Sequence, residues 1–390
     1  MKEPLDTMNS RERLLAALNH KEPDRIPIDL GGTPTSTIAV SALENLKSHL
    51  GIRSETRVMN PVFMTAYPDA EIVRRFGIDI KMVTPKPSGG FKLGSGPEGR
   101  VIDEWGIVYK KHEIAETHFI VESESPLHCV TEKEEVDRYP WPDPTDPSRV
   151  EGLRETARKY REDGFGVVAN TPFLIMTHTQ WMRGLEQYMM DTVLNPDLLE
   201  YMMDKILEII MEITRRFLNE VGDYTDVVVM GDDLSHQGGL TYSPEMYRKL
   251  LKPRHKRIVE FLRSHAKNAK ILYHCCGAVE PLIPDLIELG IDALNPVQVS
   301  AKGMGDTRRL KAIYGKEITL WGGIDTQWAL PFGTLEDVRA EVRRRIEDLA
   351  SGGGFVLAAV HNIRPEVKPE NICALFDAAR EYGKYPIRTE

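Results

Sequence analysis

The stretch that decides the fold runs from Ile318 to Ile363, where two short apolar runs enclose an amphipathic helix. The runs read ITLWGGID (318–325) and FVLAAVHNI (355–363), and the segment between them reads LEDVRAEVRRRIEDL (335–349). A strand, a helix and a second strand in this order are typical of a βαβ unit in a parallel sheet. The apolar residues that fall on one face of the helix are Leu335, Val338, Val342, Ile346 and Leu349.

The same alternation extends from this unit towards the amino terminus. Counting all the β-rich runs gives eight strands, so the sequence predicts an α/β fold, a single (β/α)₈ TIM-type barrel over residues 1–390. A doubly wound open sheet is the alternative. After the second run, residues 86–144 interrupt the alternation of strands and helices. Their pattern predicts a β-hairpin insertion. The six earlier runs are Arg25–Gly32, Ile78–Pro85, Gly166–Phe173, Asp226–Ser235, Lys270–Gly277 and Ile291–Gln298.

The composition excludes several classes of function. The chain has 390 residues, a formal net charge of −9 and no block of basic residues, which argues against nucleic acid or an anionic membrane as partner. Its apolar runs are too short to cross a bilayer, and the amino terminus shows no secretion signal. Only four cysteines occur, and two of them are adjacent, so we expect a reducing cytoplasm rather than a disulfide scaffold.

Polar and metal-capable side chains begin where the predicted strands end. In a (β/α)₈ barrel, the active site lies at the carboxyl ends of the strands. His274 and Cys276 stand two residues apart on the fifth strand and therefore face the same side. Imidazole and thiolate are ligands that zinc prefers, and His361 after the eighth strand is a candidate third ligand. The alternative is a buried cysteine beside a hydrogen-bonded histidine.

The other strand ends supply candidates for catalysis and binding. Asp232 and Asp233 alternate in direction, and Asp233 is predicted to point into the barrel mouth as an acid or base. Asp232 is a second catalytic candidate, with capping of the next loop as its alternative. Asn170, Gln298 and Asp325 are the candidates for binding substrate. Cys275 has the opposite parity to Cys276 and is predicted to be buried between barrel and helices.

At these residues the sequence resembles the uroporphyrinogen decarboxylase superfamily, and within it the zinc-dependent corrinoid methyltransferases. That branch binds zinc through a histidine, a cysteine two residues later and a cysteine near the start of the last βα loop. His274 and Cys276 match the first two ligands, whereas His361 replaces the last cysteine. The resemblance covers nearly the whole chain and rests on segments 11–32, 231–261, 274–298, 322–334 and 361–372.

The decarboxylase branch fits less well. Its members hold a tetrapyrrole with arginines after the first strand, but residues 31–40 here read GGTPTSTIAV and contain none. The catalytic aspartate that follows the second strand in that branch also has no match, because Thr84, Pro85 and Lys86 stand there. The resemblance therefore implies another reaction than uroporphyrinogen decarboxylation.

The resemblance implies a zinc-dependent methyltransferase that uses a corrinoid. The chain contains no D-x-H-x-x-G segment of the kind that ligates cobalt, so the corrinoid is expected on a separate protein. The substrate is expected to be a small methylated donor or a thiol acceptor. One alternative is a metal-free carboxy-lyase that acts on a different, non-porphyrin carboxylate, with Asp233 and His361 as acid and base. A non-catalytic corrinoid- or tetrapyrrole-binding module is another.

Overall fold

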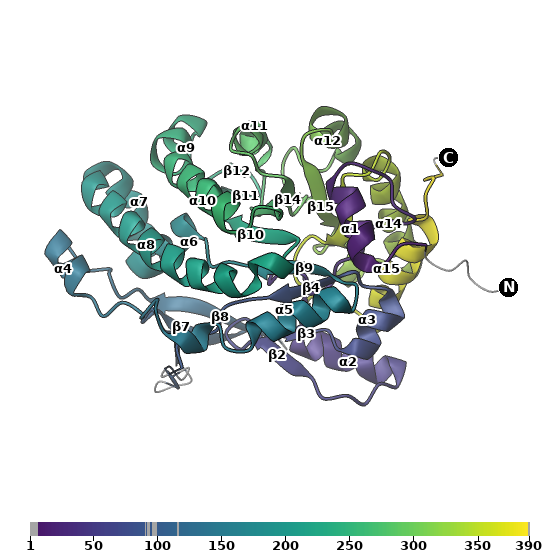
Figure 1. The fold of residues 1–390 in the computed structure, drawn as a ribbon, viewed down its shortest axis with the longest axis horizontal. Helices are drawn as coiled ribbons and strands as arrows, with labels where there is room; N and C mark the ends of the chain where they lie inside the picture. Colours follow the sequence, from purple (N-terminus) through teal and green to yellow (C-terminus); the bar gives the residue numbers. More distant parts are fainter. Residues whose placement is uncertain (1–6, 90, 92–93, 96–99, 115–116, 389–390) are drawn as a thin grey trace.

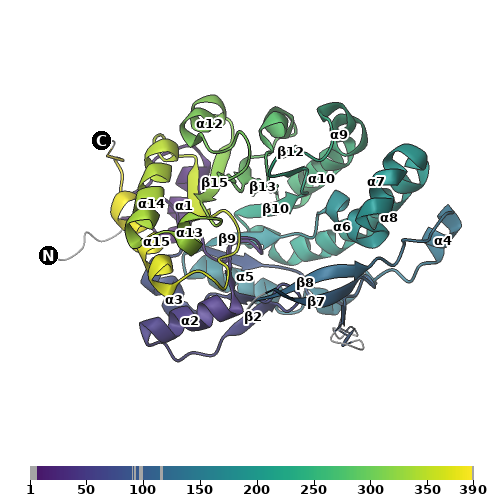
Figure 2. The same cartoon turned by 180° about the vertical axis from the view of Figure 1, so that it is seen from behind.

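A computed structural model describes residues 7–89, 91, 94–95, 100–114 and 117–388 of the chain. A seven-stranded sheet forms its centre, in the order β16–β15–β14–β13–β10–β9–β4, and every neighbouring pair is parallel. The sheet curls, and helices cover its outer side (Figures 1 and 2). The strands are β4 (Ile80–Val83), β9 (Gly166–Asn170), β10 (Val227–Gly231), β13 (Lys270–His274), β14 (Ala293–Asn295), β15 (Thr319–Ile324) and β16 (Phe355–Ala359).

A short segment, residues 26–29, lies between the two edges of this sheet. Asp29 N donates to Leu357 O at 2.8 Å, and Leu357 N donates to Pro27 O at 3.0 Å, so the segment pairs with β16. On its other side, Asp79 N donates to Ile28 O at 2.9 Å, immediately before β4. These bonds join the first and last strands of the sheet, and the predicted TIM-type barrel is confirmed.

The first predicted strand, Arg25–Gly32, does not form a regular strand. It forms only isolated bridges, such as Ile28 to Leu357, instead of a regular ladder. Pro27 has no N–H to donate, and Ile28 N donates to the Asp79 carboxylate at 2.8 Å rather than to a strand carbonyl. The other seven predicted strands are present, and each ends one to four residues earlier than the sequence indicated.

The Asp79 carboxylate is the centre of a buried ion cluster at this junction. Its side chain is fully buried, and its two oxygens accept from Arg13 Nη1 and Arg25 Nη1, both at 2.7 Å. Arg13 belongs to helix α1 (Ser10–Leu18) and also pairs with Asp24 at 2.7 Å. The cluster thus ties α1, the 26–29 segment and the start of β4 together.

The barrel has two core clusters, one inside the strands and one outside them. The inner cluster includes Val229, Leu272 and Trp321, together with Leu14 and Leu18 from α1. Helix α1 therefore closes the amino-terminal end of the barrel. The outer cluster packs under helices α8 (Pro196–Val221), α10 (Lys252–His265), α14 (Leu335–Leu349) and α15 (Pro369–Tyr382).

Most additions to the barrel follow the carboxyl ends of its strands. A three-stranded sheet, in the order β1–β3–β2, follows the 26–29 segment. Strands β5 to β8 form a four-stranded antiparallel sheet between β4 and β9 in the chain. None of the helices in the described part of the chain is long and apolar enough to cross a membrane. The added strands are β1 (Ile38–Ala39), β2 (Arg57–Asn60), β3 (Thr65–Tyr67), β5 (Gly94–Ser95), β6 (Val101–Ile102), β7 (Val108–Ile114) and β8 (Thr117–Glu124).

Candidate metal centre

Three side chains with metal-ligating atoms meet at the carboxyl end of the barrel. His274 is the last residue of β13, Cys276 follows two residues later, and His361 stands just beyond β16. One ligand atom from each lies within 4.8 Å of the others, and His274 Nε2 is 3.5 Å from Cys276 Sγ. The donor set of two imidazoles and one thiol matches that of catalytic zinc sites, which use three protein ligands. The structure thus brings together the three ligands that the sequence predicted.

The hydrogen bonds of His274 fix which nitrogen can bind a cation. Its Nδ1 lies 2.7 Å from Asn295 Oδ1, and an amide oxygen only accepts. With the amide oxygen of Asn295 on this side, Nδ1 is the donor and Nε2 is the nitrogen that faces Cys276. The hydroxyl oxygen of Thr35 lies 3.1 Å from the same Nδ1. A partner on the second nitrogen is the usual way in which a metal-binding histidine is oriented.

The electrostatics of the site also suit a cation. Burial, reinforced by the neighbouring His274, lowers the pKa of His361 to about 4, although the Asp233 carboxylate opposes the shift. His361 is therefore neutral at pH 7 and keeps a free lone pair. Burial, followed by the charge of Asp233, raises the pKa of the Cys276 thiol above its ordinary value. A bound cation would reverse that effect, because it favours the thiolate.

The two adjacent aspartates take opposite sides of the strand end. Asp233 is exposed, and its Oδ1 accepts from Cys276 N at 3.2 Å, so it lies beside the candidate ligands. Asp232 is fully buried behind the strand. It accepts from Thr177 N at 2.9 Å and lies 2.9 Å from His255 Nε2 on α10. This placement does not support the prediction that Asp232 is catalytic, since it cannot touch a substrate in the mouth.

The three predicted substrate-binding side chains have partners within the protein. Asn170 Nδ2 donates to Thr84 Oγ1 at 3.4 Å. Gln298 Oε1 accepts from Gly277 N at 2.7 Å, which holds the loop after Cys276. Asp325 accepts from the backbone at the start of α13 (Ala329–Phe332), with the nearest N–H, that of Gln327, at 2.8 Å. Gln298 and Asp325 thus use these oxygens to hold loops at the mouth.

Sequence reasoning missed two residues of the site, Thr35 and Asn295. Asn295 ends β14, and its register with His274 in the neighbouring β13 places the two side by side. An amide at the end of the strand next to a candidate histidine ligand was a usable signal. Thr35 comes from a loop 239 positions away in sequence, and nothing in the local pattern distinguishes it from the other hydroxyl residues there.

Cys275 differs sharply from its neighbour Cys276. It is fully buried in the outer core cluster, as its strand parity predicted, with its Sγ 3.6 Å from Ser235 Oγ. Burial raises the pKa of its thiol to about 12, so it stays protonated.

We therefore expect Cys275→Ser to leave the metal content of the purified protein unchanged, because the replaced atom faces away from the barrel mouth. Metal analysis by mass spectrometry would measure this. A loss of metal in that variant would mean that Cys275, and not Cys276, is the ligand.

Two curated proteins are similar to this chain over part of its length. Methylcobamide:CoM methyltransferase MtaA of Methanosarcina barkeri is 29% identical over 157 residues, which are 40% of this chain and 42% of that protein. Uroporphyrinogen decarboxylase of Thioalkalivibrio sulfidiphilus is 29% identical over 148 residues, 37% of this chain and 40% of that protein. The chain thus spans about two fifths of the length of the curated relatives that it matches.

A solved structure and a family model extend the comparison. A methyltransferase from Methanosarcina mazei superposes with a TM-score of 0.62 and 20% identity, covering 96% of this chain and 99% of that one, which shows a shared fold. The model of the family described as uroporphyrinogen decarboxylase (URO-D) matches residues 121–382. Because that match takes in well over half of the chain, the protein belongs to the uroporphyrinogen decarboxylase family.

Proposed function

We propose that this protein is a zinc-dependent methyltransferase that exchanges a methyl group with a corrinoid carried by a separate protein. The observation that carries the proposal is the convergence of His274, Cys276 and His361 within 4.8 Å. Their ligand atoms lie together at the end of the barrel where the active sites of this fold lie. The similarity to a methylcobamide:CoM methyltransferase supports the choice of reaction.

Zinc would be held by His274 Nε2, the Cys276 thiolate and an imidazole nitrogen of His361. When bound, zinc would supply Lewis acidity, which lowers the pKa of a thiol acceptor or draws electron density from a methyl donor. With one thiolate among three ligands the site keeps a net positive charge, which favours the second role. Asn295 and Thr35 orient His274, and Asp233 is placed to hold or deliver a proton at the mouth.

Two measurements on chain purified without chelator test this proposal. Metal analysis should find about one zinc per chain, as expected for a mononuclear site with these ligands. Methyl transfer from methylcobalamin to a panel of thiols, or from methylated amines or ethers to cob(I)alamin, should depend on that zinc. The purified chain should be colourless, because the corrinoid arrives on another protein. Full turnover without any corrinoid would rule the methyltransferase out.

Zinc affinity is expected to increase with pH. Because the pKa of the Cys276 thiol is raised by burial, the metal-free site holds a proton that must leave when zinc binds. The apparent affinity should rise about tenfold per pH unit between about pH 6 and pH 8. The proton of His361, whose pKa is lowered to about 4, competes only in more acidic solution. Competition with a zinc-binding dye would measure the slope, and a flat profile would show that no thiolate takes part.

Uroporphyrinogen is expected not to be a substrate, although several relatives carry the name of its decarboxylase. Residues 31–40 contain no arginine to pair with its carboxylates, and burying unpaired carboxylates is prohibitively costly. In this segment, Thr35 instead contacts His274. Coproporphyrinogen formation above that of a heat-treated control would contradict the prediction.

A further inference from the structure

A hollow lies on the flank of the barrel, and none of the three candidate metal ligands lines it. It occupies about 340 Å³ between the β2–β3 hairpin, the start of α3 (Ala70–Phe76), strand β4 and helix α5 (Leu153–Glu162). This volume falls within the range of small-molecule pockets. Its lining includes the side chains of Arg57, Tyr67, Lys81 and Tyr160, with Glu55 and Asp69 as the acidic members.

Lys81 is the most unusual of these side chains. It is partly buried on β4, with its Nζ 6.0 Å from the ring centre of Tyr160 and 5.5 Å from that of Phe165. Within the described part of the chain, its ammonium makes no hydrogen bond or ion pair. Burial lowers the pKa of Lys81, although the charge of Asp69 opposes the shift. Holding a cation partly out of water without a counter-ion costs free energy. An anionic ligand would offset that cost.

Three more donors face the same space. The guanidinium of Arg57 stacks over the ring of Tyr67, 5.3 Å from its centre. Among the described residues, neither the guanidinium of Arg57, which is exposed, nor the hydroxyls of Tyr67 and Tyr160 have a hydrogen-bond acceptor. The pocket therefore combines two cations and two phenol groups with aromatic walls.

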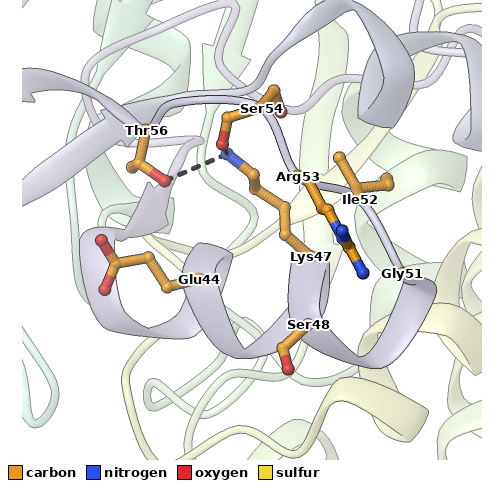
Figure 3. A pocket seen from close by; sticks show the side chains of 8 residues that line it. All are labelled: Glu44, Lys47, Ser48, Gly51, Ile52, Arg53, Ser54 and Thr56. Atoms are coloured by element: carbon orange, nitrogen blue, oxygen red, sulfur yellow. Dashed lines mark hydrogen bonds between the residues drawn. The ribbon is translucent and has the colours of Figure 1, made fainter.

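Among the described residues, the acidic side chains of the lining form no ion pair with Lys81 or Arg57. Asp69 accepts from Ser54 Oγ at 2.7 Å and from Ile72 N at 3.2 Å, and it pairs with Lys47 Nζ at 3.2 Å. Glu55 is exposed. Lys47 offers a contrast, because it donates to Ser54 O at 2.5 Å and Thr56 Oγ1 at 3.1 Å in the neighbouring hollow (Figure 3).

We propose that this flank pocket binds a small organic oxyanion, a carboxylate or a phosphate on a flat body. Lys81 and Arg57 hold the anion, and the rings of Tyr67 and Tyr160 pack against the body. Charge-assisted hydrogen bonds to Lys and Arg are the strong ones in such sites. The site shares no residue with the metal centre.

Calorimetry on the full chain tests the site with phenyl phosphate, benzoate and inorganic phosphate, and with benzylamine as the cationic counterpart. We expect phenyl phosphate or benzoate to bind, with the tighter of the two identifying the anion. Lys81→Met should weaken the binding about tenfold or more, and Arg57→Gln about fivefold, as loss of a hydrogen bond to a charged group implies. Arg53→Gln is the matched control and should bind normally, because Arg53 is exposed and lines the neighbouring hollow.

Several outcomes would overturn the proposal. They are the absence of binding by every anion at millimolar concentration, binding unchanged in Lys81→Met, or benzylamine binding as tightly as the anions. Inorganic phosphate binding as tightly as phenyl phosphate would overturn the role of the aromatic walls. Because Lys81→Met should retain its zinc, metal analysis of the same samples separates failure of this site from failure of the metal centre.

Discussion

Cys276→Ala is expected to remove zinc from the purified protein. The thiolate is the only anionic group among the three candidate ligands, and its sulfur lies 3.5 Å from His274 Nε2. Loss of a partner outside the ligand set already lowers metal affinity by about 10- to 100-fold, so loss of a ligand should cost more than about 100-fold. Metal analysis and competition with a zinc-binding dye would measure the decrease.

Two further variants serve as comparisons for Cys276→Ala. Cys129→Ala removes an exposed cysteine and should leave zinc content unchanged. His361→Cys puts a second thiolate in place of the imidazole and should retain zinc, because zinc binds both kinds of ligand. If Cys276→Ala kept its full zinc content, the cluster of His274, Cys276 and His361 would not be the metal site.

Of the substitutions proposed, Asp79→Asn is expected to cause the largest decrease in the free energy of unfolding. The substitution keeps the shape of the side chain but removes the charge that Arg13 and Arg25 share, both at 2.7 Å. The side chains of these arginines are only 1% and 6% exposed, so water cannot replace the carboxylate. Breaking a buried ion pair by removing one partner costs about 3–5 kcal/mol. Urea denaturation would measure the decrease in the free energy of unfolding.

The matched control for this variant is Asp377→Asn. Asp377 pairs with Arg75 at 2.6 Å, but the two side chains are 43% and 41% exposed. Exposed pairs contribute about 0–1 kcal/mol, so this variant should unfold almost like the unaltered protein. An equal loss of stability in both variants would show that burial of the Asp79 cluster is not what matters.

The sequence predicted the barrel because its main signal is local. Seven strands were visible as short apolar runs, and strand parity alone put His274 and Cys276 on one face and Cys275 on the other. The first strand forms only isolated bridges because Ile28 N donates to the Asp79 carboxylate instead of a strand carbonyl, a contact that no strand pattern encodes. Likewise, only the folded chain shows that Thr35 reaches His274.

Asp232 and Asp233 show the same limit of prediction from sequence at the end of a strand. Parity correctly separated Asp232 from Asp233, but it could not show that the inner partners of Asp232 are Thr177 N and His255. Those contacts come from α6 (Ile175–Arg183) and α10, and depend on how the helices pack against the barrel. Side-chain roles that depend on such packing are therefore decided by tertiary structure.

The pairing of residues 26–29 with β16 has a consequence for the order in which the protein is made. The bond from Asp29 N to Leu357 O joins positions that are more than three hundred residues apart. Synthesis proceeds at about 5–20 residues per second, so the early segment waits tens of seconds or more on the ribosome for its partner. During that interval the wall of strands has an open seam with two unpaired edges, and such edges invite pairing with other chains. The two edges can therefore be joined only after Leu357 has been synthesised.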